Sequence, residues 1–331
     1  MVDLNIILGG NNMKQYTIAS LFSGAGGLDL GFENAGFQTI WANDIDEDAL
    51  KTHAEWSNSE LVHGDIEKLN LDKIPETDLI LGGFPCQGFS LAGPRKIDDS
   101  RNKMYRNFVD LVRLKKPSVL VAENVKGLLT MGEGKIFEAI IEDFSESGYD
   151  IFYKLVNSKN FGVPQERERV IIVGFRRDLE IEKFEIPEGN GETITIGDAI
   201  GDWEEPNDDE VIQDSYSSRF MSRNRKRNWD EFSYTIPAQA KQVPLHPSSP
   251  DMEKLGKDEW KFGDNGKTRR FSWKEAAAIQ TFPKDLYFHG DLRSKYKQIG
   301  NAVPVKLAET VANEIKKTLE KANVKVGVIN G

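Results

Sequence analysis

The stretch that decides the fold is Tyr16-Thr17-Ile18-Ala19-Ser20-Leu21-Phe22-Ser23-Gly24-Ala25-Gly26-Gly27-Leu28. Its first seven residues are mostly apolar and predict a buried strand, while residues 28–35 have the apolar spacing of a helix. The turn between them is rich in glycine, which allows a ligand to approach the backbone closely. The stretch therefore predicts a strand, a turn and a helix, and the glycines indicate either a ligand site or simple turn chemistry.

Strand and helix patterns continue to alternate after this unit. Further strands are predicted at 39–42, 79–82, 119–122, 149–157 and 170–175, and further helices at 47–56, 104–114 and 135–147. Strands that alternate with helices form mostly parallel sheets with helices on both faces. We therefore predict an α/β fold built on a doubly wound, mostly parallel, Rossmann-like sheet.

The character of the sequence changes along the chain. Residues 1–13 form a polar extension, and from about residue 179 to residue 264 the chain is rich in Gly, Pro, Asp and Ser. Helical patterning resumes at 273–279, and an amphipathic helix is predicted at 305–319. Because a structureless run of that length is uncommon within one domain, we predict a large domain over 14–178, a smaller domain of strands and loops over 179–290, and a return to the large domain over 291–331.

The totals describe a globular chain of 331 residues, of which 39% are hydrophobic and 29% charged. No apolar run has the length of a membrane-spanning helix, and residues 1–8 lack the basic start of a signal peptide, so we expect a cytoplasmic protein. The formal net charge of −10 disfavours nucleic acid as a partner. Binding depends on a local basic face, however, and the Arg-rich stretch 219–227 forms either such a face or a solvated loop.

Cys86 is the only cysteine of the chain and lies in the run Gly82-Gly83-Phe84-Pro85-Cys86-Gln87-Gly88-Phe89-Ser90. A single thiol excludes an internal disulfide and a cysteine cage around a metal, and we expect no metal site. The run follows the apolar residues 79–81, which places the thiol at a strand end. A thiol in that position is a candidate nucleophile, and the alternative is a small buried hydrophobe.

The glycine-rich turn does not have the dinucleotide fingerprint, because Asp29 occupies the position of its third glycine. Asp44 follows the second predicted strand, and Asp65 lies in the run Gly64-Asp65-Ile66. Asp44 can accept hydrogen bonds from ribose hydroxyls, and Asp65 can meet the amino group of adenine. The alternative for each is a helix N-cap, for which Asp46 is the better candidate. Together these residues predict an adenosine-bearing ligand without a pyrophosphate, which S-adenosylmethionine fits.

Three further runs complete the pattern. They are Glu123-Asn124-Val125, Gln165-Glu166-Arg167-Glu168-Arg169-Val170 and Gln298-Ile299-Gly300-Asn301-Ala302-Val303-Pro304. With the glycine-rich turn and the Pro-Cys-Gln loop, they make the chain resemble the DNA cytosine-5 methyltransferases of bacterial restriction-modification systems, and their order is the family's order. The resemblance covers nearly the whole chain apart from residues 1–13 and the variable middle.

The resemblance implies methylation of C5 of cytosine in a short, specific double-stranded DNA sequence. Cytosine becomes nucleophilic at C5 when a thiolate adds to C6, and Cys86 would supply this thiolate. Glu123 would meet N3 and the exocyclic amine and offset the charge that builds on the ring. Arg169, together with Arg167, would hold O2 of the base and a nearby phosphate.

The resemblance also implies which residues contact S-adenosylmethionine. They are Phe22, Gly24, Gly26, Gly27, Asp44, Ile45, Asp65, Ile66, Pro85, Asn301 and Val303. The chain departs from the family pattern at Asp44, which is one methylene shorter than the frequent Glu, and at Ile45, where an aromatic residue often packs on adenine.

The implied DNA contacts fall in two regions. The loop 87–102 would close over a base that has been flipped out of the duplex, and it contributes Gln87, Ser90 and Arg101. In the middle region, which resembles a target-recognition domain, Thr235-Ile236-Pro237 is similar to the dipeptide that marks this domain. The residues expected there are Arg223, Arg225, Arg227, Thr235 and Ile236.

Other functions stay open at this point. An RNA (tRNA) cytosine-5 methyltransferase would use the same chemistry, and a catalytically silent DNA-binding regulator would keep the fold. The intact Cys86, Glu123 and Arg169 argue against the regulator. A Cys–His hydrolase is disfavoured because no histidine lies in a recognisable partner motif. The expected partners are double-stranded DNA and a restriction endonuclease that acts separately, and we expect a monomer without membrane association.

Overall fold

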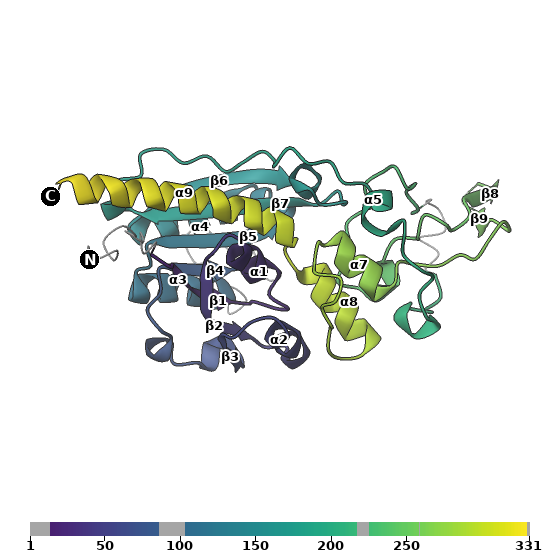
Figure 1. The fold of residues 1–331 in the computed structure, drawn as a ribbon, viewed down its shortest axis with the longest axis horizontal. Helices are drawn as coiled ribbons and strands as arrows, with labels where there is room; N and C mark the ends of the chain where they lie inside the picture. The colour runs from purple at the N-terminus through teal and green to yellow at the C-terminus, as the bar shows by residue number, and fades with distance from the viewer. Residues whose placement is uncertain (1–13, 86–102, 217–224, 258, 330–331) are drawn as a thin grey trace, which may run out of the picture.

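The computed structural model describes the chain except for residues 1–13, 86–102, 217–224, 258 and 330–331. Several residues with predicted functions, Cys86, Gln87, Ser90, Arg101 and Arg223, therefore lie outside the described residues, as does the predicted N-terminal extension. The described residues form two lobes, which Figure 1 shows side by side. The large lobe contains the main sheet, and the small lobe contains short helices, a hairpin and irregular segments.

The large lobe is built on a sheet of seven strands in the described part of the chain. Its strands are β1 (Thr17–Leu21), β2 (Gln38–Asp44), β3 (Glu60–His63), β4 (Leu79–Gly82), β5 (Val119–Val125), β6 (Tyr149–Asn157) and β7 (Glu168–Arg176). Their order is β3-β2-β1-β4-β5-β7-β6, and only β7 runs antiparallel to its neighbours. The predicted α/β fold with a mostly parallel sheet is therefore confirmed.

The strand order creates a topological switch point between β1 and β4. The chain leaves β1 toward β2 on one side and returns to β4 on the other, so that Leu21 lies opposite Asn43 in β2 and Gly82 in β4. Ligands in open α/β sheets bind outside the carboxyl ends of the strands at such a point. The fold therefore brings the segments that follow β1, β2 and β4 to one place.

Helices cover both faces of the sheet, as the alternation of apolar residues predicts. Leu79 and Leu81 of β4 point into a core that also contains residues of α1 (Gly27–Asn34) and α9 (Val305–Ile329). Ile80 points to the opposite face, into a core shared with α3 (Lys103–Lys115) and α4 (Lys135–Glu146). In Figure 1, α9 lies along the sheet for much of its length.

The small lobe has a second core, which also takes in Ala25 and Val305 of the large lobe. It combines residues of α5 (Ile196–Ile200), α7 (Trp273–Ile279) and α8 (Leu292–Asn301). A separate hairpin consists of β8 (Met252–Gly256) and β9 (Glu259–Phe262). Helix α8 packs in this core and also contacts the large lobe, where the Thr52 hydroxyl donates a hydrogen bond to Gln298 at 2.7 Å.

Local sequence explains where the helices begin. In α2 (Glu47–Ala54), the Asp46 carboxylate accepts a hydrogen bond from the backbone N–H of Ala49 at 3.3 Å, which is the N-cap expected for this residue. In α7, Ser272 and Glu275 form a reciprocal capping box. Short 3₁₀ helices connect the other elements: η1 (Ile66–Lys68), η2 (Leu71–Lys73), η4 (Lys126–Leu129), η5 (Ser158–Phe161), η6 (Arg177–Leu179), η7 (Asp208–Glu210) and η8 (Ala240–Gln242).

Strand β3 and helix α8 are among the elements that were not predicted from the sequence. Strand β3 is a short edge strand whose residues are exposed or half-buried, so it lacks an apolar run. Helix α8 is mostly polar and buries only one side of its surface. Within the described residues, no helix is long and apolar enough to cross a membrane.

Candidate active site

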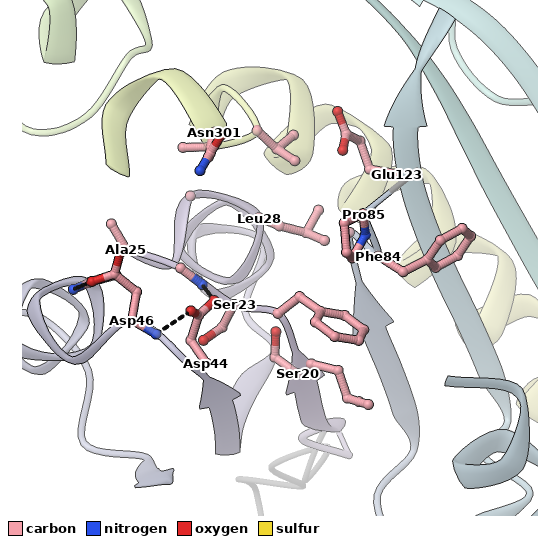
Figure 2. Close-up of a pocket in the computed structure, with 18 of the residues that line it drawn as sticks. Ser20, Ser23, Ala25, Leu28, Asp44, Asp46, Phe84, Pro85, Glu123 and Asn301 are labelled. Carbon is pink, nitrogen blue, oxygen red and sulfur yellow. Dashed lines mark hydrogen bonds between the residues drawn. The ribbon is translucent and has the colours of Figure 1, made fainter. Parts of the chain in front are cut away.

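A cavity of about 560 Å³ opens at the switch point of the sheet. The segments that follow β1, β2, β4 and α8 line it, together with residues of β5 and β7. Figure 2 shows Asp44 and Ser23 on one side, Glu123 and Pro85 on the other, and Leu28 between them. The acidic residues that follow the strands and the motifs predicted to react with a base therefore line the same cavity.

The glycine-rich turn is folded around left-handed backbone conformations. Gly24 and Gly26 have φ angles of 55° and 80°, and Phe22, which has a side chain, has a φ of 55°. A non-glycine residue in this region costs roughly 1–2 kcal/mol, and such strain concentrates at functional sites. A Cβ atom at Gly24 would find no other atom within 4 Å, so a side chain there would project into open space beside the cavity.

Asp44 ties the ends of β1 and β2 together. Its Oδ2 accepts a hydrogen bond from the N–H of Gly24, and its Oδ1 accepts one from the N–H of Asp46, both at 2.8 Å. Burial raises the pKa of Asp44, and these two N–H groups and nearby Lys297 act in the opposite direction. Each oxygen keeps a second lone pair, so the carboxylate can accept further hydrogen bonds from a ligand in the cavity.

The other residues predicted to contact the cofactor also line the cavity, except Gly26, which faces Trp56 and His53. Asp65 caps η1 by accepting a hydrogen bond from the N–H of Glu67 at 3.1 Å, so its N-cap alternative holds alongside its place in the lining. Ile66 is buried, whereas Ile45 is 66% exposed and presents an apolar side chain at the rim.

On the opposite side of the cavity, the segment after β4 is fixed by Asn124. The amide of Asn124 donates a hydrogen bond to the carbonyl of Phe84 at 2.9 Å, and Phe84 packs against Tyr105 and Phe108. Pro85 lines the cavity and is the last residue described before Cys86 in the sequence. The root of the predicted nucleophile loop is thus held in place.

Glu123 and Arg169 form an ion pair at the same side. Arg169 Nε lies 2.8 Å from Glu123 Oε1, and both side chains are about nine-tenths buried. Glu123 Oε1 has no hydrogen bond of good geometry among the described residues, so the contact is ionic and leaves hydrogen-bonding capacity on the carboxylate. Its Oε2 faces Gly83, with 3.5 Å to the position a Cβ would take there.

Arg167 has a different environment from the one expected for a base contact. It is 2% exposed, and its guanidinium donates hydrogen bonds to the carbonyls of Ile236, Gly300 and Ala302 at 3.2, 2.9 and 3.0 Å. Burial, with the neighbouring charge of Arg169, lowers the pKa of Arg167 to about 9. The side chain lines the cavity, but these donors are committed to the backbone.

Asn301 and Val303 lie where the segment after α8 meets the glycine-rich turn. Both line the cavity. A Cβ at Gly27 would clash with the carbonyl of Val303, so only glycine lets these two segments touch. The predicted cofactor residues from both ends of the sequence are therefore brought together.

The described residues predicted to contact DNA make contacts within the small lobe and to Glu166 of the large lobe. Arg227 lies 3.2 Å from Glu166 and 3.0 Å from Glu231, and its guanidinium stacks on Tyr234. The Thr235 hydroxyl donates to the carbonyl of Glu166 at 2.7 Å. Ile236 is fully buried, so its side chain is not placed to read a base. Arg225 is half-buried, and its carbonyl accepts a hydrogen bond from the N–H of Leu245.

The structure adds residues that the sequence did not single out. Lys297 lines the cavity and lies 2.7 Å from Asp46, one residue before the run at 298–304. Asp29 is fully buried beside the cavity, and burial raises its pKa to about 7. In the sequence, Asp29 stood out only because it interrupts the dinucleotide fingerprint.

Comparison with known proteins identifies the class of this protein. Residues 16–317 match the family described as C-5 cytosine-specific DNA methylase. The chain belongs to this family and is a DNA (cytosine-5) methyltransferase.

Relatives with similar sequences are Type II methyltransferases. M.BsuRI of Bacillus subtilis is 42% identical over 344 residues, which cover 90% of this chain and 78% of that protein. M.MthTI of Methanothermobacter thermautotrophicus is 42% identical over 333 residues, which cover 95% and 99% of the two chains.

Solved structures agree on the fold alone. A prophage-encoded protein of Escherichia coli has a TM-score of 0.72 at 24% identity, over 92% of this chain and all of that one. Dnmt2 of S. pombe has a TM-score of 0.68 at 18% identity, over 94% of this chain and all of that one.

Proposed function

We propose that this chain transfers the methyl group of S-adenosylmethionine to C5 of a cytosine in a short, specific double-stranded DNA sequence, with Cys86 as the nucleophile. The observation that carries the proposal is the single cavity that Asp44, Pro85, Glu123 and Arg169 line together. A cofactor site and a base site that open into one cavity suit a direct transfer between two ligands.

The residues of the cavity suit S-adenosylmethionine. Its volume is within the range of about 300–1,000 Å³ that is usual for small-molecule sites. Open space at Gly24 leaves room for a ligand against the backbone, and the free lone pairs of Asp44 suit ribose hydroxyls. Asp65, Ile66, Asn301 and Val303 would complete the site. When bound, S-adenosylmethionine supplies the methyl group that C5 takes up.

The chain's own groups would activate the base. The Cys86 thiolate forms a bond to C6, and the electron density that this addition moves onto the ring makes C5 nucleophilic. Glu123 shares a proton with N3 and so offsets the charge, while Arg169 holds Glu123 in place through the 2.8 Å ion pair. After methylation, the C5 proton passes to solvent, and the electron pair of its bond forms the C5–C6 double bond and expels the sulfur, which restores the aromatic ring and the Cys86 thiolate.

We assign DNA to the region between the lobes. The catalytic domain spans 14–178 and the return at 291–331, and the target-recognition domain spans 179–290, with α8 packed against the latter. The target base would leave the stack at a cost of roughly a few kcal/mol. The proposed DNA contacts are Gln87, Ser90 and Arg101 of the loop, together with Arg223 and Arg225. We assign a mainly structural role to Arg227, Thr235 and Ile236, which would hold the segment around 235–238 in place.

The Type II names of the relatives suggest a biological setting. We propose that the chain is a monomeric, cytoplasmic component of a restriction-modification system, in which a separate endonuclease cuts the same sequence when it is unmethylated.

Bisulfite sequencing of plasmid DNA from cells that express the chain tests the proposal, with Cys86→Ser as the matched control. The expected result is methylcytosine at one short motif, absent with Cys86→Ser. Methylated RNA together with unmodified DNA would show that the substrate is RNA. A fully active Cys86→Ser protein would show that Cys86 is not the nucleophile.

A further inference from the structure

A buried polar network joins the two lobes directly behind the cavity. We call the side chains of Gln165, Arg167 and Gln280 the junction network. Gln165 and Arg167 lie just before β7, whereas Gln280 is the C-cap of α7 in the small lobe. Gln165 and Gln280 are fully buried, and Arg167 is nearly so.

The two glutamines form a directional relay. The backbone N–H of Ile236 donates to Gln165 Oε1 at 2.8 Å, and Gln165 Nε2 donates to Gln280 Oε1 at 2.8 Å. Gln280 Nε2 then donates to the carbonyls of Ile299 and Ala302 at 2.7 and 3.1 Å. The relay therefore runs from the recognition segment at 235–238 to the cofactor segment at 299–303.

Arg167 makes a second connection between the same two segments. It donates to the carbonyl of Ile236 and to those of Gly300 and Ala302. Both backbone groups of Ile236 are thus bound by the junction network, and the carbonyl of Ala302 accepts from two of its members. A shift of either segment would break hydrogen bonds that no water can replace in a buried site.

The backbones of the two segments also pack without slack. A Cβ at Gly300 would clash with the backbone of Pro237 and Ala238. Asn301, the next residue after Gly300, lines the cavity. The position of Asn301 therefore depends on that of the recognition segment, because its neighbour Gly300 packs directly against Pro237 and Ala238.

We propose that Gln165, Arg167 and Gln280 are positioning residues that couple cofactor binding to DNA binding. A ligand that displaces or fixes either segment acts on the other through the junction network, so the first ligand changes the site that the second one meets. The coupling is reciprocal, because each ligand must change the affinity for the other by the same factor. This inference rests on the proposed function in assuming that S-adenosylmethionine and DNA occupy the assigned sites.

Titration of S-adenosylhomocysteine into the full chain, with and without a duplex that contains the methylated motif, measures this coupling. For the unmodified chain, the duplex is expected to tighten binding by about fivefold or more. In Gln280→Leu, which keeps volume but loses the relay, the factor should fall below about twofold, and KM should rise for both substrates while kcat changes less. Coupling that is absent in the unmodified chain, or unchanged in Gln280→Leu, would overturn the inference.

Two further variants separate coupling from simple loss of stability. Tyr149→Phe removes a buried hydrogen bond to the carbonyl of Pro117, far from the junction, and should keep the full coupling. Gly300→Ala keeps all three network side chains but forces the segments apart, so it should lose the coupling. It replaces Gln280→Leu in the test if that variant does not fold. Failure of the unmodified chain to bind S-adenosylhomocysteine would overturn the proposed cofactor, whereas normal binding with unchanged coupling in both junction variants would overturn this inference alone.

Discussion

The two lobes are stabilised in different ways. In the large lobe, the central strands bury apolar side chains on both faces, such as Leu79, Ile80 and Leu81 in β4. In the small lobe, irregular segments surround charges that are buried in pairs. Arg269 and Glu275 form a two-point ion pair at 2.8 and 3.0 Å, and the His246 ring lies 3.5 Å from the same carboxylate.

This difference has a consequence for stability. Apolar packing is non-directional and depends little on pH. A buried ion pair is costly to desolvate, and loss of one partner strongly destabilises the folded state. A lobe built mostly of irregular segments has few regular hydrogen-bond ladders, and the buried pairs fix those segments in one arrangement. We therefore expect the small lobe to be the more sensitive to loss of a charge.

The largest effect should come from Arg269→Met. It leaves the Glu275 carboxylate buried without its cation, which should lower the free energy of unfolding by about 3–5 kcal/mol. Urea unfolding followed by tryptophan fluorescence measures the change. The matched control is Lys261→Met, whose pairs with Glu253 and Asp264 are exposed and should contribute less than about 1 kcal/mol. Equal effects of the two variants would show that the buried Arg269 pair stabilises the small lobe no more than an exposed pair does.

A smaller effect should appear with pH, because each lobe buries one neutral histidine. Burial lowers the pKa of His53, in the large lobe, to about 4. Burial and then nearby Arg269 lower the pKa of His246 to about 3, while Glu205 acts in the opposite direction. The unfolded chain binds these protons near pH 6.5, before the folded chain does. Their stabilisation is therefore complete above about pH 6.5 and is lost as the pH falls toward 4.

Between pH 6.5 and 4.5, the expected loss is on the order of 2–3 kcal/mol for each histidine, at about 1.4 kcal/mol for each pH unit. His53→Gln and His246→Gln should each flatten the pH dependence of the unfolding free energy between pH 6.5 and 4.5. A dependence that stays as steep as in the unmodified chain would show that the rings are already charged in the folded state.

The smallest effect should come from Arg227→Gln. Because Arg227 is paired with Glu166 and Glu231, its loss should cost about 1 kcal/mol of stability and leave the salt dependence of DNA binding unchanged. A residue that neutralises a phosphate would instead reduce the slope of log K against log salt by about 0.9. Measurement of DNA affinity at several salt concentrations distinguishes these roles, and a reduced slope would return Arg227 to the DNA interface.

Much of the large lobe could be predicted because its signals are local. The strands at 79–82 and 149–157 were predicted with the bounds that the structure gives, since each is a continuous segment with flanking turn residues. The cavity could also be anticipated, because parallel strands end at one edge and place Asp44, Asp65 and Glu123 there.

The roles of Arg167 and Ile236 could not be predicted in the same way. The partners of Arg167 lie 69 to 135 residues away in the sequence, and no local pattern indicates which donors a folded chain will use internally. Ile236 belongs to a run that resembles a recognition motif, yet its side chain packs in the core of the small lobe. Helix α8 was missed for a related reason, since its buried residues meet a core formed by distant segments.

The most direct test of the account uses duplex DNA that carries 5-fluorocytosine at the methylated position. Fluorine cannot leave C5 as a proton does, so the bond between sulfur and C6 should persist after methyl transfer. With S-adenosylmethionine, the unmodified chain should form a protein–DNA complex that survives denaturation, and Cys86→Ser should form none. An equally stable complex with Cys86→Ser, or none with an active unmodified chain, would contradict the assignment of Cys86 as the nucleophile.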